Sequence, residues 1–137
     1  MTNKLNVVVG VDGSPDSQVA VRWAEQYASL TGADLTLVTA WHWPTSYGVP
    51  MAWEGWDPAV DAEQVAGKAA AELSLPPDRV HQVVQCGAAG DVLVHASTDS
   101  LLLVVGTRGH GTLAATALGS VSNYCVHHAQ CPVVVVR

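Results

Sequence analysis

Five short apolar runs recur along this chain, separated by longer segments with helical character. They are rich in valine and leucine and lie at residues 5–11, 35–40, 80–84, 101–105 and 133–136. Most are apolar on both faces, which is typical of strands in a parallel sheet covered by helices on both sides. Strands that alternate with helices favour right-handed crossovers, so we predict an α/β fold with a single, doubly wound, open parallel five-stranded sheet.

The intervening segments carry start and stop signals for helices. Ser14 is a favourable N-cap before Pro15, and Gly32 is well placed to end the first helix. Asp57-Pro58 opens a second helix in the same way, and the Pro76-Pro77 pair stops it. Two further helices are expected over residues 91–97 and 120–130, the latter ended by a proline at position 132.

Residues 41–56 differ from the rest of the chain because they hold four of its five tryptophans among prolines and glycines. We expect an ordered loop there, between the second strand and the second helix. No break in composition, low-complexity tract or internal repeat divides the chain. A single domain over residues 1–137 is therefore expected.

Charge and hydropathy exclude several classes of protein. With 49% hydrophobic and 13% charged residues, the chain can build a core and is not of the disordered type. Its apolar runs are far shorter than a membrane span. The net charge of −6 argues against a general nucleic-acid binder, although all 12 acidic residues precede position 100. The acid-free final segment is thus the place where a phosphate is best tolerated.

The cysteines and the first residues indicate the cell compartment. Cys86, Cys125 and Cys131 are odd in number and do not form a disulfide-like pattern. The first 13 residues lack the basic segment, long apolar stretch and cleavage site of a signal peptide. A reducing, cytoplasmic location is the expectation.

Glycine-rich segments follow two of the expected strands and open one helix. The first strand runs into Gly10-Val-Asp-Gly-Ser14, and the fourth runs into Gly106-Thr-Arg-Gly-His-Gly111. Gly119-Ser-Val-Ser122 opens the last helix. Ligands of open α/β sheets bind outside the carboxyl ends of the strands, and helix N-termini suit phosphate groups. A single loop of this kind is as often a simple tight turn, but two clusters together favour phosphate binding.

Two common phosphate motifs fit this segment poorly. Residues 106–112 have the glycine spacing of a P-loop, but they lack the lysine that reaches the β- and γ-phosphates. Gly109-x-Gly111-x-x-Ala114 matches a loose dinucleotide fingerprint, but no acidic residue follows for the ribose. Both a P-loop NTPase and an NAD enzyme are therefore disfavoured.

A third motif fits closely. Gly106-x2-Gly109-x9-Gly119-Ser120 resembles the ATP-binding signature of the universal stress protein family. The similarity includes the Val-Val-Val-Gly-Val-Asp-Gly-Ser segment that ends at Ser14 and the His-His-Ala-Gln-Cys-Pro segment before the last strand. The chain is thus identified as a member of this family, in its ATP-binding subclass.

The resemblance implies a sheet with strand order 3-2-1-4-5 and ATP, with Mg²⁺, lying across the ends of strands one, two and four. It implies that Asp12 contacts the ribose or a phosphate-bound metal, that the main chain of Ala40 recognises adenine, and that the segment from Gly119 holds the phosphates. Arg108 either adds charge or faces solvent. The residues that it places at the nucleotide are Val11, Asp12, Ala40, Val105, Gly106, Arg108, Gly109, Gly119, Ser120, Val121 and Ser122.

The middle of the chain departs from the family pattern. Residues 41–56 are not a family hallmark, and Gly87-Ala-Ala-Gly-Asp91 replaces the more usual Gly-x-Pro-Ala helix entry. Trp41 follows the adenine strand and either stacks on the base or packs in the protein; packing is favoured. Contacts on the adenine side are therefore the least determined part of the site.

No nucleophile, base and orienting group can be assembled into a catalytic site from this sequence. A zinc site is disfavoured as well, because its candidate ligands point apart on a helix; they are Cys125, His127, His128 and Cys131.

The leading hypothesis is a regulatory ATP-binding stress protein that forms a homodimer through the last strand, between Pro132 and Val136. One alternative is a slow ATP hydrolase or nucleotidyl-transfer enzyme on the same site. Another is an interaction dimer that does not use nucleotide.

Overall fold

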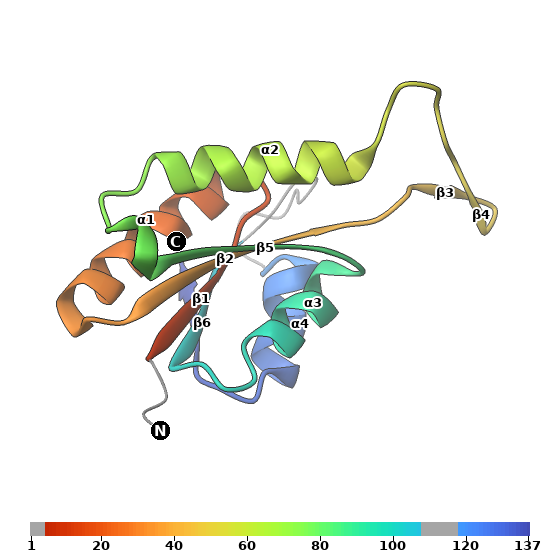
Figure 1. The fold of residues 1–137 in the computed structure, drawn as a ribbon. Coiled ribbons are helices and arrows are strands. Elements are labelled where there is room, and N and C mark those ends of the chain that lie inside the picture. Colours follow the sequence, from red (N-terminus) through yellow and green to blue (C-terminus); the bar gives the residue numbers. More distant parts are fainter. Residues whose placement is uncertain (1–4, 108–117) are drawn as a thin grey trace.

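The computed structural model describes residues 5–107 and 118–137. Its central feature is a five-stranded parallel sheet with the order β5-β2-β1-β6-β7 (Figure 1). The strands are β1 (Asn6–Gly10), β2 (Asp34–Trp41), β5 (Val80–Cys86), β6 (Leu102–Gly106) and β7 (Val133–Val136). Counted without the short strands β3 and β4, this is the order 3-2-1-4-5, so the predicted fold is confirmed.

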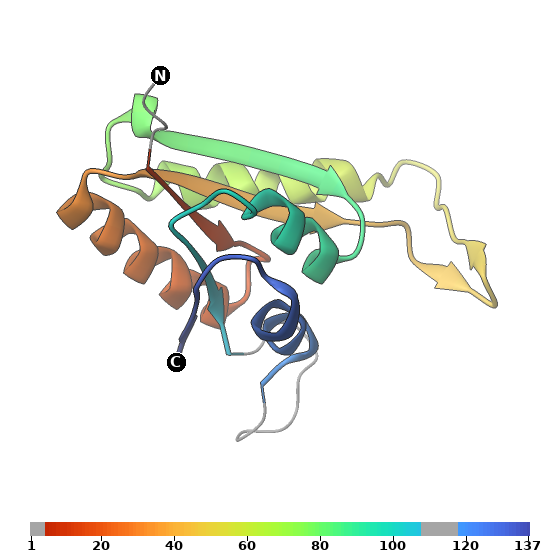
Figure 2. The same ribbon diagram turned by 90° about the horizontal axis from the view of Figure 1, so that it is seen from below.

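Two helices cover each face of the sheet (Figures 1 and 2). Helices α1 (Pro15–Thr31) and α2 (Pro58–Ala71) lie on one face, and α3 (Ala89–Ala96) and α4 (Ser120–His128) lie on the other. The core accordingly has two parts, because alternate strand residues point to opposite faces. Val7 and Val9 pack beneath α1, whereas Val8 packs with Leu93 and Cys125 beneath α3 and α4.

Helix α1 begins and ends where the sequence predicts. The Ser14 hydroxyl accepts a hydrogen bond from the Ser17 N–H at 3.2 Å, which satisfies one of the free donors of the first turn. Gly32 adopts the left-handed conformation with φ of 77°, and its N–H donates to Ala28 at 2.9 Å. Local signals therefore fix this helix.

The other helix boundaries differ from the sequence prediction. Helix α2 opens at Pro58 as expected but ends at Ala71, and the prolines begin a short 3₁₀ turn, η1 (Pro77–Arg79). Helix α3 starts at Ala89, two residues earlier than predicted. Helix α4 ends at His128 rather than at residue 130, because Ala129 is already extended as the chain turns back towards β7. Proline marks the latest possible end of a helix, not its actual end.

The tryptophan-rich segment, predicted as an ordered loop, contains a short hairpin. Strand β2 continues through Trp41, and residues 42–56, here called the arm, contain a hairpin of β3 (Thr45–Ser46) and β4 (Val49–Pro50). Tyr47 and Gly48 form its turn with φ values of 51° and 78°. Figures 1 and 2 show the arm extending away from the body of the molecule.

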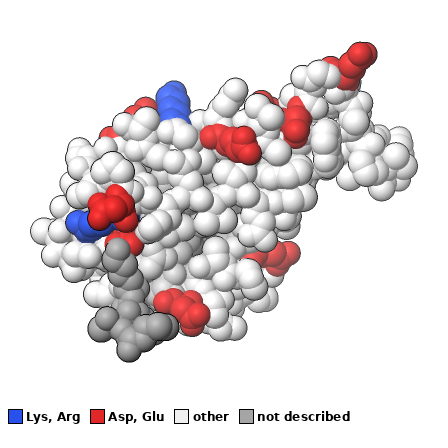
Figure 3. All heavy atoms as spheres, in the orientation of Figure 1, with Lys and Arg blue, Asp and Glu red and all other residues white. Residues whose placement is uncertain are grey.

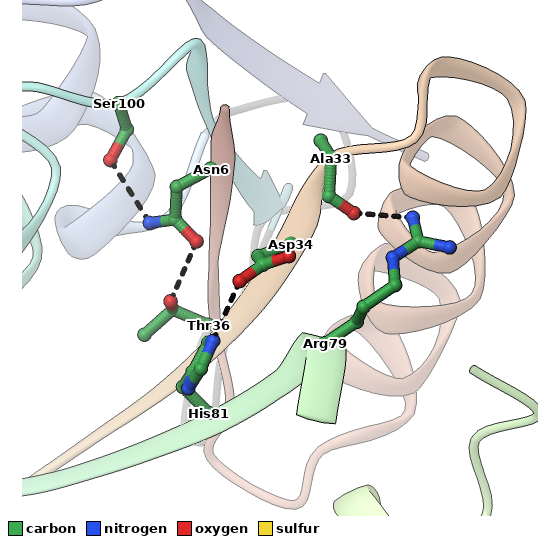
Figure 4. A network of polar contacts seen from close by, with 7 residues as sticks. All are labelled: Asn6, Ala33, Asp34, Thr36, Arg79, His81 and Ser100. Atoms are coloured by element: carbon green, nitrogen blue, oxygen red, sulfur yellow. Dashed lines mark hydrogen bonds and ion pairs between the residues drawn. The ribbon is translucent and has the colours of Figure 1, made fainter. Parts of the chain in front are cut away.

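Polar side chains tie together the amino ends of the strands (Figure 4). Asn6 accepts a hydrogen bond from Thr36 at 2.8 Å, and His81 lies 2.9 Å from the carboxylate of Asp34. The Arg79 guanidinium donates to the carbonyl oxygens of Ala28 at 2.8 Å and Ala33 at 2.6 Å. These contacts join β1, β2, β5 and the end of α1 at the amino ends of the strands.

Among the described helices, none is both long enough and apolar enough to cross a membrane.

Candidate functional site

A cavity of about 360 Å³ lies at the carboxyl ends of β1, β2 and β6. This size is within the range of small-molecule sites. The position is where open α/β sheets bind ligands, because the chain leaves the sheet in opposite directions on the two sides of this point. Its walls are formed by Gly10, Val11, Asp12, Ser17, Val38, Ala40, His42, Ala89, Leu93, Val105, Gly106, Gly119, Ser120, Val121 and Ser122.

The structure brings together nine of the eleven residues that the sequence placed at the nucleotide. These are Val11, Asp12, Ala40, Val105, Gly106, Gly119, Ser120, Val121 and Ser122. Arg108 and Gly109 lie outside the described residues. The shared cavity establishes that the nine are neighbours, while their individual contacts with a ligand stay a prediction.

The turn after β1 is held by hydrogen bonds within its own segment. The carboxylate of Asp12 accepts a hydrogen bond from the Ser14 N–H at 2.8 Å, and the Asp12 N–H donates to the Ser17 hydroxyl at 3.3 Å. Asp12 is nevertheless exposed at the cavity wall. Its carboxylate is thus oriented by the start of α1 and remains accessible from the cavity.

The end of β6 packs tightly against the first turn of α1. A Cβ atom on Gly106 would lie 2.8 Å from the carbonyl oxygen of Asp16, closer than real Cβ contacts allow. The next residue, Thr107, donates a hydrogen bond to the Asp16 carboxylate at 3.0 Å. Glycine is therefore required at position 106 by the close approach of two backbones.

Helix α4 presents its N-terminus to the cavity. Its N-cap is Gly119, which has no side chain to accept hydrogen bonds from the first-turn N–H groups. The Gly119 N–H itself donates to the Thr107 carbonyl at 2.7 Å and so fixes the helix start beside β6. The free N–H groups and the positive end of the helix dipole together favour an anion.

The hydroxyl of Ser122 has a structural partner that the sequence did not predict. It lies 2.9 Å from the Thr107 carbonyl and 3.0 Å from the Gly119 carbonyl, and Ser122 is buried. Because carbonyl oxygens only accept, the single hydroxyl proton is already engaged. Ser120, by contrast, is exposed at the cavity wall.

The main chain of Ala40 faces the same space. Alternate residues of a strand direct their N–H and C=O groups to the same side. Val38 accepts a hydrogen bond from the Val11 N–H at 2.9 Å, whereas Trp41 accepts one from Gly87 on the other side at 2.8 Å. Ala40 therefore directs its N–H and C=O groups to the side of β1. Because β1 ends at Gly10, opposite Val38, no residue of β1 lies opposite Ala40.

Six lining residues were not predicted: Gly10, Ser17, Val38, His42, Ala89 and Leu93. Val38 could have been found, because it lies two residues before Ala40 on the same face of β2. Leu93 and Ala89 come from α3, and the sequence contains no signal for how that helix is placed. His42 follows β2 and also stands on the cavity wall.

Electrostatics at the cavity depend on the main chain. The described lining residues include no lysine or arginine. On the face drawn in Figure 3, the Lys and Arg side chains are few and separate, while Asp and Glu are scattered over several elements. Among the described residues, the groups at the cavity that suit an anion are N–H groups and hydroxyls.

Two side chains of α4 have raised pKa values. Burial, followed by the nearby Cys131, raises the pKa of the Cys125 thiol to about 11. The hydrogen bond from Tyr124 to Asp91 raises the pKa of the Tyr124 hydroxyl. In the described part of the chain, no group of three or more His, Cys, Asp or Glu residues is arranged to hold a metal ion.

The family comparison agrees with this geometry. The model of the universal stress protein family matches residues 5–137. This chain belongs to the universal stress protein family. The resemblance drawn from the glycine and serine signature is confirmed.

Curated relatives are universal stress proteins of mycobacteria. The chain is 39% identical over 98% of its length to universal stress protein Rv2623 of Mycobacterium tuberculosis, and covers 48% of that protein. It is 37% identical over 96% of its length to Rv2005c of the same species, and covers 45% of it. The chain thus spans about half the length of the curated relatives that it matches.

Solved structures of the family share the whole fold. A universal stress protein in complex with cAMP aligns with a TM-score of 0.72 and 28% identity, covering 99% of both chains. UspA from Lactobacillus plantarum aligns with a TM-score of 0.73 and 23% identity over 100% of both chains. A universal stress protein from Archaeoglobus fulgidus in complex with dAMP has a TM-score of 0.68 and 20% identity, covering 97% and 98%.

Proposed function

We propose that this universal stress protein binds an adenine nucleotide, ATP with Mg²⁺, and acts in the cytoplasm as a regulatory module of the stress response. The observation that carries the proposal is the cavity itself. It combines the N-terminus of α4, which has no side-chain cap, with the ends of three strands. The complex of a related protein with cAMP supports an adenine nucleotide as the ligand.

The residues present fit such a ligand. The first-turn N–H groups of α4 and the exposed hydroxyl of Ser120 suit the phosphates, where an uncapped helix N-terminus favours negative charge. The carboxylate of Asp12 suits a ribose hydroxyl or Mg²⁺, which prefers oxygen ligands and phosphates together. The free main-chain groups of Ala40 suit the edge of adenine, which both donates and accepts hydrogen bonds.

We also propose a homodimer through β7. Its four valines, Val133–Val136, are half-buried, although the strand lies at the edge of the sheet. An apolar edge strand invites pairing with another strand, and a second copy offers an identical one. Analytical ultracentrifugation of the wild type and of Val135→Lys would test this, and a monomeric wild type would contradict it.

Calorimetric titration of the purified protein with ATP and Mg²⁺ tests the nucleotide proposal. We expect saturable binding that is lost in Gly119→Val, because the added side chain crowds the helix start while the backbone there (φ −66°, ψ 164°) accepts valine. Gly67→Ala is the matched control, since it changes a glycine on α2 with no atom within 4 Å of the new methyl group.

The outcomes separate the hypotheses. Absence of heat and of any shift in melting temperature at millimolar ATP would contradict nucleotide binding and would favour a nucleotide-independent dimer. Release of ADP well above background in the wild type, and its loss in Gly119→Val, would instead indicate an ATP hydrolase. Binding without turnover is the result that we expect.

A further inference from the structure

His42 stands on the cavity wall two residues after Ala40, at the base of the arm. Its side chain has hydrogen-bonding atoms, and the residue lines the same cavity as Ala40. A backbone edge alone binds any base with a compatible pattern, whereas a side chain can add selectivity. The question is therefore which hydrogen-bonding groups the imidazole offers.

The contact of the ring with the main chain defines its hydrogen-bonding character. Nδ1 of His42 lies 3.2 Å from the carbonyl oxygen of Trp43. A carbonyl oxygen only accepts hydrogen bonds, so Nδ1 must carry the proton. In the neutral ring, Nε2 then has a lone pair and acts as an acceptor. The ring thus offers an acceptor to a ligand.

Contacts within the arm position Trp43, whose carbonyl oxygen lies next to the His42 ring. Trp43 packs edge-on against Trp56 with ring centroids 5.7 Å apart, and the indole N–H of Trp56 donates to the Asp61 carboxylate of α2 at 2.8 Å. Across the arm, the Met51 N–H donates to the Pro44 carbonyl at 2.7 Å. The tryptophans therefore connect the residue after His42 to helix α2.

We propose that His42 is a specificity-determining residue that accepts a hydrogen bond from the exocyclic 6-amino group of adenine. This inference rests on the proposed function and adds the side chain that distinguishes 6-amino purines from 6-oxo purines. Hypoxanthine and guanine present a carbonyl oxygen at position 6, and two acceptors facing each other repel. An acceptor at this position therefore favours 6-amino purines over 6-oxo purines.

The test compares ATP with ITP, which differ at position 6, by calorimetric titration in the presence of Mg²⁺. We expect the wild type to prefer ATP by about tenfold, as one hydrogen bond is worth on the order of that factor. In His42→Phe, which keeps an aromatic ring but no acceptor, ATP should bind more weakly and the preference for ATP over ITP should fall several-fold, with the remaining preference due to the main chain of Ala40.

A second variant separates recognition from packing. In His42→Gln, the side-chain amide can offer either its oxygen to ATP or its NH₂ group to ITP, so ATP binding should be kept while ITP binding improves. A residue with a merely structural role would not improve the binding of ITP while leaving the binding of ATP unchanged. His95→Gln is the matched control, since His95 is exposed on α3 and outside the cavity wall, and its preference should equal that of the wild type.

Each result has a distinct meaning. Equal affinities of the wild type for ATP and ITP, or an unchanged preference in His42→Phe, would overturn the role of His42 while leaving nucleotide binding intact. Failure of the wild type to bind either nucleotide would overturn the proposed function, and the role of His42 with it.

Discussion

The two ends of the same parallel sheet are built in opposite ways. At the amino end, side chains pair with one another and with nearby carbonyl groups, as in the contact of Asp34 with His81 and the hydrogen bond from Arg79 to Ala33 (Figure 4). Arg79 also donates to the carbonyl oxygen of Ala28. At the carboxyl end, β1 and β6 end at glycines, and helix α4, which comes after β6, has no side-chain cap. One end is closed by its own residues, and the other leaves main-chain groups available to a ligand.

The two ends of the sheet therefore contribute differently: the amino end to the stability of the fold and the carboxyl end to ligand binding. Buried polar groups that are paired stabilise the fold, whereas groups left for a ligand contribute only when it is bound. Substitutions at the amino end should therefore lower the free energy of unfolding without affecting nucleotide affinity. Substitutions at the carboxyl end should affect affinity, with a cost in stability only where backbones are in close contact.

The largest effect on stability is expected for Arg79→Ala. It removes two hydrogen bonds from a charged group and leaves the Ala28 and Ala33 carbonyl oxygens without that donor, so the free energy of unfolding should fall by about 3 kcal/mol. Urea unfolding measures this, and ATP affinity should be unchanged. Arg22→Ala is the control, because Arg22 is exposed on α1, and it should change stability by no more than about 0.5 kcal/mol. Equal losses in both variants would contradict the role of the amino-end contacts.

Gly106→Ala should affect stability and binding together. Its Cβ would lie 2.8 Å from the Asp16 carbonyl oxygen, so β6 and α1 must move apart at a cost of about 2 kcal/mol, and ATP should bind more weakly. Gly67→Ala, which has open space on a helix, should instead stabilise the protein by up to about 1 kcal/mol. Thermal unfolding with and without ATP measures both effects; a stable Gly106→Ala variant with full affinity would show that the close approach is dispensable.

Ser122→Ala and Ser120→Ala should separate two neighbouring hydroxyls. The Ser122 hydroxyl holds the Thr107 and Gly119 carbonyl groups, so its removal should cost about 1 kcal/mol of stability. Ser120 is exposed at the cavity, so Ser120→Ala should leave stability unchanged and weaken the binding of ATP several-fold. Urea unfolding and calorimetry on both variants give the comparison, and identical behaviour of the two would show that burial does not distinguish them.

The last effect depends on pH and concerns the middle of α4. Folding raises the pKa of the Cys125 thiol from about 9 to about 11, so the folded protein holds this proton more tightly than the unfolded chain does. The resulting stability is complete below about pH 9 and is lost as the pH rises towards 11. Urea midpoints of the wild type should therefore fall more steeply over this range than those of Cys125→Ala. Cys86→Ala is the control, because Cys86 is exposed, and its midpoints should follow the wild type.

Much of the fold could be predicted from local signals. The alternation of apolar runs with capped helices gave the α/β class, and the Ser14 and Gly32 signals gave the ends of α1. The arm was harder to predict because its hairpin turns at Tyr47, a residue type that rarely adopts a positive φ. Helix ends were missed by a few residues, since the point where the chain must turn back depends on the strand that follows.

The sequence by itself determined the family, the order of the elements and nine residues that share the cavity, because a glycine and serine signature is a local pattern. Only the tertiary structure decided that the Ser122 hydroxyl is engaged with carbonyl groups, and that Ala89, Leu93 and His42 line the same space. These facts depend on where β1 ends against β2 and on how α3 and the arm are placed. Such distances arise between segments far apart in the chain, and no local pattern encodes them.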